Sequence, residues 1–497
     1  MKISRAIFSV SDKTGIVEFA KFLTKKKVKI FSTGGTAKFL QQNQILVREI
    51  SEITNFPEIL DGRVKTLHPK IFGGILANRE NENHLSQIKE QEIKTIDLVF
   101  VNLYPFLENP KIENIDIGGP SLLRAAAKNW QSVIPICEIS DAKKIQQEIE
   151  KSDTISEETK KKLAGKVFAK IAEYDSAIAK FFDPNFTAVF GEKIYDLKYG
   201  ENPHQKGSVF KIKNDKTFPC LPNSKKISGG EMGFCNFLDA DAALNLISEL
   251  PAEKFCAAAI LKHSNPCGAA IGKNIFEAFQ KALDADPISA FGGIVVLNQK
   301  LELDLAEKIS ETFFEIVLAP EISLEAIKIL EKKKKLRLFE FGKKINKTGE
   351  KEIKSISGGF LQQEKNIFTS EKLEIISGKI SDTQKKDLQF AEKICKFVKS
   401  NAITIVKNGK TIGIGAGQMS RVDATRIAIE KAGENCQGAV LASDAFFPFP
   451  DSVEIAAKKG IVAIVQPGGS IRDEQVFSAA KKLGVAMAIT GQRNFWH

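Results

Sequence analysis

Residues 28–42 read VKIFSTGGTAKFLQQ, an apolar run followed by a glycine-rich stretch and a helix-forming segment. The pattern predicts a strand at 28–31, a turn STGGT at 32–36 and a helix at 37–42. Two adjacent glycines let backbone N–H groups point to one side at a helix start, where they can bind an anion such as a phosphate. A plain tight turn has the same sequence nearly as often, so the segment indicates the local fold more firmly than the function.

The same alternation continues on both sides of this segment. Apolar runs predict further strands at 6–10, 96–103 and 133–137, and amphipathic runs predict helices at 15–23, 121–128 and 157–182. Strands that alternate with helices favour a parallel sheet covered by helices on both faces. We therefore expect an α/β domain over residues 1–190.

The chain beyond residue 190 is also of α/β character. The Gly/Pro-bearing KYGENPHQ at 198–205 suggests a boundary, and apolar runs at 257–261 and 293–297 predict strands. A densely charged stretch at 331–354 separates these from a last α/β portion. We expect a second domain over 191–497, made of two sub-domains divided near 331–360.

Composition narrows the class of protein. The 497 residues are 43% hydrophobic and 27% charged, with no apolar run of membrane-spanning length and no signal-peptide pattern at the start. The 7 cysteines are scattered and form no CxxC motif, which fits reduced thiols and a cytoplasmic protein. The net charge of +11 comes from dispersed lysines, without a zinc finger or an RNA-binding signature, so we expect neither nucleic acid nor membrane as a partner.

Three loops of the first domain carry groups that suit a nucleotide monophosphate. SVSDKTG at 9–15, STGGT at 32–36 and GRVKTLHP at 62–69 each offer hydroxyl or cationic groups, and in a parallel sheet such loops meet at one edge. The GxGxxG pattern of dinucleotide sites is absent, which argues against NAD. The first loop offers Ser11, Lys13 and Thr14, the second the hydroxyl groups of STGGT, and the third Arg63, Lys65, Thr66 and His68.

A second set of groups near these loops suits proton transfer. NLYPF at 102–106 supplies Tyr104, and IDIGGPSLLRAAAKN at 115–129 supplies Asp116 and Lys128. Together with Lys65, these groups could move protons during a ring closure or a dehydration. Each also has an ordinary interpretation as a helix cap or an ion-pair partner.

Residues 261–269, LKHSNPCGA, place Lys262 beside His263 on what we expect to be a tight loop shaped by proline and glycine. A base next to a cation suits acyl-group transfer, because one accepts a proton and the other stabilises developing charge. A histidine that merely caps a strand end is an equally good interpretation. A zinc deaminase would need HxE and PCxxC, and here the second cysteine and the HxE motif are missing, so we expect no metal.

Taken in order, these motifs resemble the family of bifunctional purine biosynthesis enzymes that join an IMP cyclohydrolase to an AICAR (aminoimidazole carboxamide ribonucleotide) formyltransferase. The resemblance covers essentially the whole chain, and includes SAFGG, KNGKTIGIGAGQMSR, SDAFFPFPDS and the terminal histidine. It implies a methylglyoxal synthase-like first domain and two cytidine deaminase-like α/β sub-domains lacking zinc. It also implies 10-formyltetrahydrofolate as co-substrate, with AICAR, formyl-AICAR and IMP as ligands, and a homodimer with formyltransferase sites at the interface.

The resemblance further assigns roles to single residues. It makes His263 the base for the AICAR amino group, Lys262 the stabiliser of the tetrahedral intermediate, and Asn408 an orienting group. It makes Lys65, Tyr104, Asp116 and Lys128 the groups that close formyl-AICAR to IMP. The residues that it assigns to the phosphate and sugar in the same domain are Ser11, Lys13, Ser32, Thr33, Gly34, Arg63 and Thr66. The remaining residues that it assigns to the nucleotide and folate pockets are Lys198, Tyr199, Phe291, Gly292, Phe446, Asp451, Arg493 and His497.

Two departures from the family pattern stand out. Lys198 occupies a position where the family usually has arginine, so a bidentate grip on phosphate would become a single point charge. Pro450 replaces an arginine before Asp451. Two other classes of protein stay open at this level, namely a zinc-dependent nucleoside hydrolase and a non-enzymatic nucleotide- or RNA-binding protein.

Overall fold

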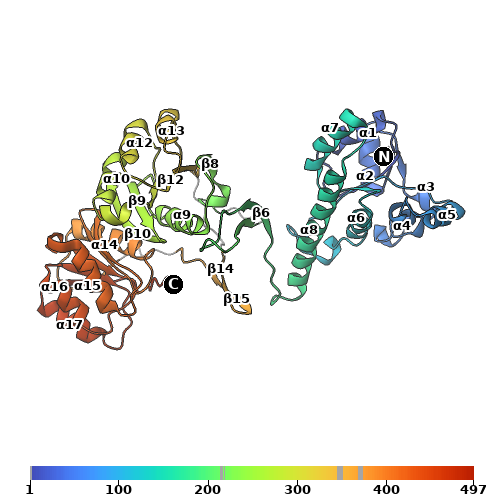
Figure 1. Ribbon diagram of the computed structural model, residues 1–497. Coiled ribbons are helices and arrows are strands. Elements are labelled where there is room, and N and C mark those ends of the chain that lie inside the picture. The colour runs from blue at the N-terminus through green and yellow to red at the C-terminus, as the bar shows by residue number, and fades with distance from the viewer. Residues whose placement is uncertain (1–2, 213–216, 218, 344–350, 368–372) are drawn as a thin grey trace. The chain divides into compact units, whose positions relative to one another are not determined.

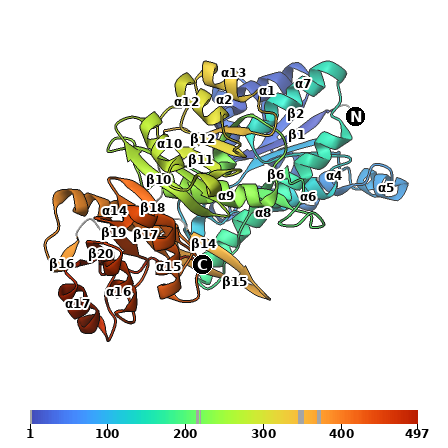
Figure 2. The ribbon, with the colours of Figure 1, turned by 60° about the vertical axis from the view of Figure 1, so that its left-hand side comes forward.

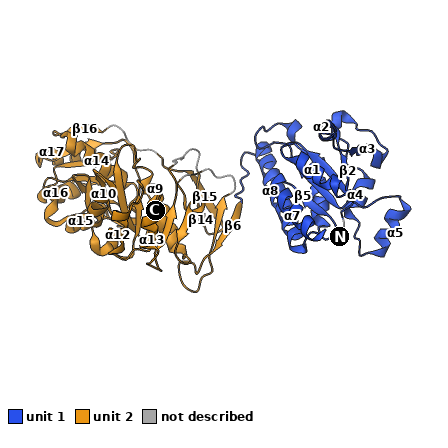
Figure 3. Cartoon of the chain, turned by 90° about the horizontal axis from the view of Figure 1, so that it is seen from above, with its two compact units in different colours: residues 1–190 blue, residues 191–497 orange. Residues whose placement is uncertain are grey.

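The computed structural model describes residues 3–212, 217, 219–343, 351–367 and 373–497. The chain divides into two compact units, Met1–Phe190 and Gly191–His497 (Figures 1 and 3). None of the helices in these described ranges combines the length and the apolar character of a membrane span.

The first unit is built on a five-stranded sheet of order β3-β2-β1-β4-β5, in which every neighbouring pair is parallel. Its strands are β1 (Arg5–Val10), β2 (Lys29–Ser32), β3 (Val47–Glu49), β4 (Leu98–Asn102) and β5 (Ile134–Ile136). Its helices are α1 (Ile16–Lys25), α2 (Gly34–Gln42), α3 (Ser51–Thr54), α4 (Pro69–Leu76), α5 (Glu82–Glu90), α6 (Gly118–Lys128), α7 (Ala142–Ser152) and α8 (Glu157–Phe182).

Alternation along β1 explains why both faces of this sheet are covered. Phe8 points into a core that includes residues of α1, α2 and α7. Its neighbour Ile7 belongs to a second core with residues of α4, α6 and α8. Successive side chains of a strand face opposite sides, so each face buries its own helices and the sheet is fully enclosed.

The predicted α/β class with a parallel N-terminal sheet is confirmed, with one local correction. STGGT was expected to be a turn that precedes a helix, but α2 already begins at Gly34 with Thr33 as its N-cap. The glycines therefore lie inside the first turn of the helix, because Gly34 tolerates the backbone angle (φ 30°) that the tight entry requires.

The second unit is built on one twelve-stranded sheet with two halves of the same construction. The first half has strands β8 (Lys225–Ser228), β9 (Cys256–Lys262), β10 (Asn265–Gly272), β11 (Ile294–Leu297), β12 (Ile316–Ala319) and β13 (Arg337–Glu340), and helices α9 (Phe234–Ile247), α10 (Ile275–Leu283), α11 (Pro287–Ala290), α12 (Leu303–Ser310) and α13 (Leu324–Leu330). The second half has strands β16 (Glu374–Ser377), β17 (Ile403–Lys407), β18 (Lys410–Gly415), β19 (Val440–Ser443), β20 (Ala463–Gln466) and β21 (Ala486–Ile489), and helices α14 (Asp382–Cys395), α15 (Arg421–Ala432), α16 (Asp451–Lys458) and α17 (Asp473–Lys482).

The two halves match strand by strand. From the centre outwards, each half runs through an antiparallel hairpin, a third antiparallel strand, two parallel strands and an antiparallel edge strand. Helices α9 and α14 bury their apolar sides in one core shared by both halves. On the other face each half keeps a core of its own. The last strand of the first half, β13, lies inside the range 331–360 where we expected the division, while residues 344–350 of that range are outside the described residues.

The halves join where β10 lies antiparallel to β18, with Ala270 opposite Lys410 (Figure 2). Ile271 N–H also donates to the Gly409 carbonyl oxygen at 2.9 Å. The turn between β17 and β18 therefore lies beside the far end of β10, and the turn between β9 and β10 lies at the opposite edge of the sheet. Two smaller hairpins complete the unit, β6 (Gly191–Asp196) with β7 (Ser208–Ile212) and β14 (Lys351–Ile356) with β15 (Gly359–Glu364).

Candidate active sites

The first unit has a cavity of about 720 Å³ at the carboxyl ends of β1, β2 and β4 and at the N-terminal ends of α2 and α6. Helix N-termini present unpaired N–H groups, which favour an anionic ligand. Eight of the residues predicted from sequence line this cavity: Ser11, Lys13, Thr33, Arg63, Lys65, Thr66, Tyr104 and Asp116. Two independent features, backbone donors and three cationic side chains, therefore suit a phosphorylated ligand at this position.

Two predicted binding residues, Ser32 and Gly34, do not line the cavity. The hydroxyl of Ser32 is buried and donates to the Phe8 carbonyl oxygen at 2.7 Å, so it holds β2 against β1. Gly34 lies one residue before Gly35, which does line the cavity. The sequence identified the right segment but not which of its residues face the ligand.

Lys128 also lies away from the cavity. It is the last residue of α6, whereas Gly118 and Gly119 at the first turn of the same helix line the cavity. Ten residues of α-helix separate the two ends by roughly 15 Å. Within this unit, the expectation that Lys128 acts beside Tyr104 and Asp116 is therefore not met, because a rigid helix separates two residues of one motif.

Asp116 has the electrostatic character of an acid–base group. Burial is the largest influence and raises the pKa of its carboxyl above the usual range, against the lowering effects of the Gly119 N–H and the Lys65 ammonium. Its Oδ1 accepts from the Gly119 N–H at 2.8 Å, which fixes the carboxylate at the start of α6. A fixed carboxyl with a raised pKa beside a lysine can both take up and release a proton.

Asn102 and Thr36 are parts of this site that the sequence did not reveal. The Asn102 side chain accepts from the Ser11 N–H at 2.5 Å and donates to the Asp12 carbonyl oxygen at 2.6 Å, and so shapes the loop that carries Lys13. The Thr36 hydroxyl donates to the Val10 carbonyl oxygen at 2.9 Å and ties α2 to the end of β1. Asn102 is the first residue of the NLYPF motif. Its position at the end of a predicted strand could have identified it as part of the site.

In the second unit, Lys262 and His263 lie at the turn of the β9–β10 hairpin. Lys262 ends β9, and the turn itself consists of His263 and Ser264, with φ of 53° and 60°. Pro266 and Gly268, expected to shape the loop, lie instead in β10, where the register shifts between them. The turn is shorter than expected because two residues with left-handed backbones suffice to reverse the chain.

Other predicted residues gather around this turn. The Lys262 ammonium donates to the Phe291 carbonyl oxygen at 2.8 Å, which brings Phe291 and Gly292 next to the pair. Lys198 and Tyr199 lie at the N-terminal end of α9, where the Tyr199 carbonyl oxygen accepts from the Phe234 N–H at 3.3 Å. Lys198 is exposed at this helix start.

The C-terminal tail is fixed at the same edge of the sheet. The Asn265 side chain accepts from the Lys399 N–H at 2.9 Å, and Ser400 N–H donates to the Trp496 carbonyl oxygen at 2.9 Å. Arg493 and His497 belong to this tail, and the Arg493 guanidinium lies 4.4 Å from the centre of the Phe495 ring. Phe446 and Asp451 follow the carboxyl end of β19, which lies beside the start of β17 at this edge.

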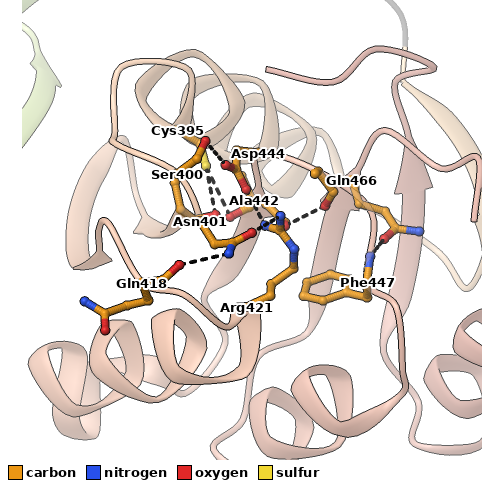
Figure 4. Close-up of polar contacts among 12 residues, drawn as sticks. Cys395, Ser400, Asn401, Gln418, Arg421, Ala442, Asp444, Phe447 and Gln466 are labelled. Atoms are coloured by element: carbon orange, nitrogen blue, oxygen red, sulfur yellow. Dashed lines mark hydrogen bonds and ion pairs between the residues drawn. The ribbon is translucent and has the colours of Figure 1, made fainter. Parts of the chain in front are cut away.

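A buried polar network holds these segments together (Figure 4). The Arg421 guanidinium pairs with the Asp444 carboxylate and donates to the Asn401 side chain at 2.7 Å. Asp444 also accepts from the Ser400 hydroxyl at 2.6 Å. Helix α15, the end of β19 and the segment before β17 are therefore fixed relative to one another, and the tail with them.

Asn408 is the one predicted formyltransferase residue that the chain places elsewhere. It lies in the β17–β18 turn, beside Ile271 at the far end of β10. Eight residues of strand separate it from His263, an extent on the order of 25 Å. Within a single chain, Asn408 therefore cannot orient groups that react at His263.

Cys267 has no sign of a metal-binding thiolate. Burial is the largest influence on this group and raises its pKa to about 12, so the thiol is protonated at neutral pH. Within the described ranges, no group of three or more His, Cys, Asp or Glu side chains is arranged to hold a metal ion.

Comparison with known proteins gives the family of the chain. The family model described as AICARFT/IMPCHase bienzyme matches residues 126–431, and the model described as MGS-like domain matches residues 15–129. The chain belongs to the AICARFT/IMPCHase bienzyme family. Two relatives named bifunctional purine biosynthesis protein PurH, from Bacillus cereus and Bacillus thuringiensis, are each 46% identical to it over 99% of both chains. The crystal structure of ForH is 35% identical and covers 36% of this chain and 96% of its own, but its TM-score of 0.34 is too low to support a structural argument.

Membership of the AICARFT/IMPCHase family decides between the classes of protein that the sequence left open. The matches favour neither a zinc-dependent nucleoside hydrolase nor a non-enzymatic nucleotide- or RNA-binding protein.

Proposed function

We propose that this chain catalyses the last two steps of IMP synthesis, namely formyl transfer to AICAR and closure of formyl-AICAR to IMP. The observation that carries the proposal is the full-length similarity to PurH proteins together with two separate sites of suitable chemistry. Ring closure is assigned to residues 1–190 and formyl transfer to residues 191–497.

Ring closure needs a proton donor and acceptor near a held phosphate. The carboxamide nitrogen attacks the formyl carbon and loses one proton, and the formamide nitrogen loses its proton as it forms a double bond to that carbon. The former formyl oxygen takes up two protons and leaves as water. We assign the exchange of these protons to Lys65 and Asp116, which line the cavity together with the exposed side chain of Tyr104. The groups assigned to the phosphate and ribose are Ser11, Lys13, Thr33, Arg63 and Thr66.

Formyl transfer needs a base for the attacking amine and a cation for the charge that develops. His263 accepts the proton of the AICAR amino group as that nitrogen bonds to the formyl carbon. Lys262 stabilises the oxygen of the tetrahedral intermediate and helps to protonate the donor nitrogen as its bond to the formyl carbon breaks. We assign 10-formyltetrahydrofolate as the formyl donor, bound between the turn and the groups Phe446, Asp451, Arg493 and His497.

The test of the transfer step compares two substitutions of His263. His263→Ala should lower the rate of formyl transfer by about 10²–10⁴-fold, because that is the usual contribution of a general base. His263→Asn keeps size and hydrogen bonding but not basicity, so it should be equally impaired. The products formed from AICAR and 10-formyltetrahydrofolate are quantified, with cyclisation of formyl-AICAR as internal control. Near-normal transfer by His263→Asn would remove His263 from the mechanism.

The position of Asn408 supports a homodimer with shared formyltransferase sites. If Asn408 acts at the reacting groups, it must come from a second copy, because its own chain holds it at the far edge of the sheet. A mixture of the variants His263→Ala and Asn408→Ala should then recover activity that neither variant has alone. Random pairing gives mixed dimers with one intact site, or about a quarter of the wild-type activity. No recovery after unfolding and joint refolding, with dimers present, would contradict a shared site.

We also propose a cytoplasmic location. All 7 cysteines are free thiols, which fits a reducing compartment.

A further inference from the structure

The turn that carries His263 has an unfavourable sequence for its conformation. A two-residue hairpin turn of this kind needs positive φ at both central positions, which Asn-Gly adopts most readily. His263 and Ser264 have φ of 53° and 60° although both carry a Cβ atom. Their conformation must therefore be stabilised by contacts from outside the turn.

Asp239 of α9 supplies these contacts. Its Oδ1 accepts from the Ser264 N–H at 2.7 Å and from the Ser264 hydroxyl at 3.2 Å, and its Oδ2 accepts from the His263 N–H at 3.2 Å. One carboxylate thus binds both N–H groups that the turn presents. Asn265 secures the other side, since its side-chain amide donates to the His263 carbonyl oxygen at 3.0 Å.

The second half of the unit contains the same arrangement. Asp387 of α14 accepts from the Asn408 N–H at 2.8 Å and from the Gly409 N–H at 2.7 Å. Both aspartates are the sixth residue of their helices, α9 and α14. The contact between one carboxylate and both N–H groups of the turn therefore occurs in both hairpins and belongs to the fold that the two halves share.

The two turns differ in how much they depend on it. Asn408-Gly409, with φ of 52° and 67°, has the favoured sequence for the turn and would form it without help. His263-Ser264 has no such preference. Removal of Asp239 should therefore release the His263-Ser264 turn, whereas removal of Asp387 should leave the Asn408-Gly409 turn largely unchanged.

We propose that Asp239 is a positioning residue for formyl transfer, which holds the His263 backbone so that the imidazole meets the amino group of the substrate. This inference rests on the proposed role of His263 as base. Asp239 does not touch the reacting atoms; it acts only through the turn.

The test measures kcat and KM of formyl transfer in Asp239→Ala and in Asp239→Asn. Misplacement of a catalytic group by about 1 Å lowers the rate by up to about 100-fold, so kcat of Asp239→Ala should fall about 10- to 100-fold with KM for AICAR nearly unchanged. Asp239→Asn keeps one acceptor oxygen and should show a smaller loss. Asp241, exposed on the same helix and bonded to Asn245, provides the matched control, and Asp241→Ala should keep the wild-type kcat.

Rescue separates positioning from a general effect on stability. Ser264→Gly removes the conformational penalty at the second turn position, so the double variant Asp239→Ala/Ser264→Gly should regain most of the lost kcat. A helix destabilised by loss of Asp239 would not be repaired by this change. Full kcat in Asp239→Ala, or a loss that Ser264→Gly leaves in place in a folded protein, overturns the inference. If His263→Ala keeps a near-normal rate of formyl transfer, the proposed role of His263 as base is wrong. If His263→Ala is impaired but Asp239→Ala keeps the wild-type kcat, the role of His263 stands and the positioning role of Asp239 is wrong.

Discussion

At the scale of single residues, Asp116 shows how the role that we propose for a buried carboxyl conflicts with stability. Burial raises its pKa, so the fold favours the protonated carboxyl more than the unfolded chain does. Between its unfolded and its folded pKa, the folded state binds more protons, and stability falls as pH rises through that window. Above this window the ionised Asp116 carboxylate is therefore less favourable in the folded first unit than in the unfolded chain.

We expect Asp116→Asn to abolish most cyclisation and to raise the thermal midpoint of the first unit at neutral pH. The amide cannot exchange the proton but can still accept from the Gly119 N–H. Cyclisation rates and thermal unfolding at neutral pH give both values. Asp12 provides the contrast, because the Thr14 N–H and hydroxyl lower its pKa, and Asp12→Asn should lower the midpoint. A lower midpoint in Asp116→Asn would contradict this account.

At the scale of elements, most helices and strands could be predicted from the sequence, because apolar periodicity depends on local spacing. The helix expected at 157–182 has the bounds of α8. The turn at His263 could not be predicted, because its conformation depends on a carboxylate that lies 24 residues earlier in the chain. The predicted helix 121–128 ends at Lys128, as α6 does, so the distance between Lys128 and the first turn of α6 follows from the helix itself.

The Arg421–Asp444 pair gives a prediction for helix α15. Both side chains are almost fully buried, at 6% and 0% exposure. Arg421→Ala leaves a buried carboxylate without its cation and should lower the free energy of unfolding by about 3–5 kcal/mol. Arg426 pairs with Asp423 on the exposed side of the same helix, and Arg426→Ala should change it by less than about 1 kcal/mol. Urea unfolding measures the change in the free energy of unfolding for both variants. A change for Arg421→Ala as small as that for Arg426→Ala would show that the buried network is not essential to the fold.

At the scale of the whole molecule, the division at residue 190 predicts an autonomous first unit. All residues that line its cavity lie between Ser9 and Gly119, and both of its cores are complete within residues 1–190. A fragment of residues 1–190 should therefore fold and convert formyl-AICAR to IMP, but should not formylate AICAR. Circular dichroism confirms folding before the assay. A folded fragment without cyclisation activity would show that the second unit contributes to ring closure.

The separation of His263 from Asn408 belongs to this scale too, and no local pattern reveals it. It follows from the antiparallel pairing of β10 with β18, two strands more than 130 residues apart in sequence. Long-range strand pairing leaves no periodic signal in either segment, so motif order alone suggested one compact site.

The matched halves of the second unit also have a historical meaning. Two tandem copies with the same strand order are what the duplication and fusion of one ancestral gene would leave behind. In such an ancestor the strand equivalent to β10 and β18 would have paired with the same strand of a second molecule. Each end of this pair of strands would then have carried the same hairpin turn. Such a fusion would have allowed the two turns to diverge, one to His-Ser and the other to Asn-Gly, while both halves kept the aspartate that binds the turn. On this view, the contact between the aspartate and the turn is older than the sequence of the turn, and His263 arose on a turn that the aspartate already stabilised.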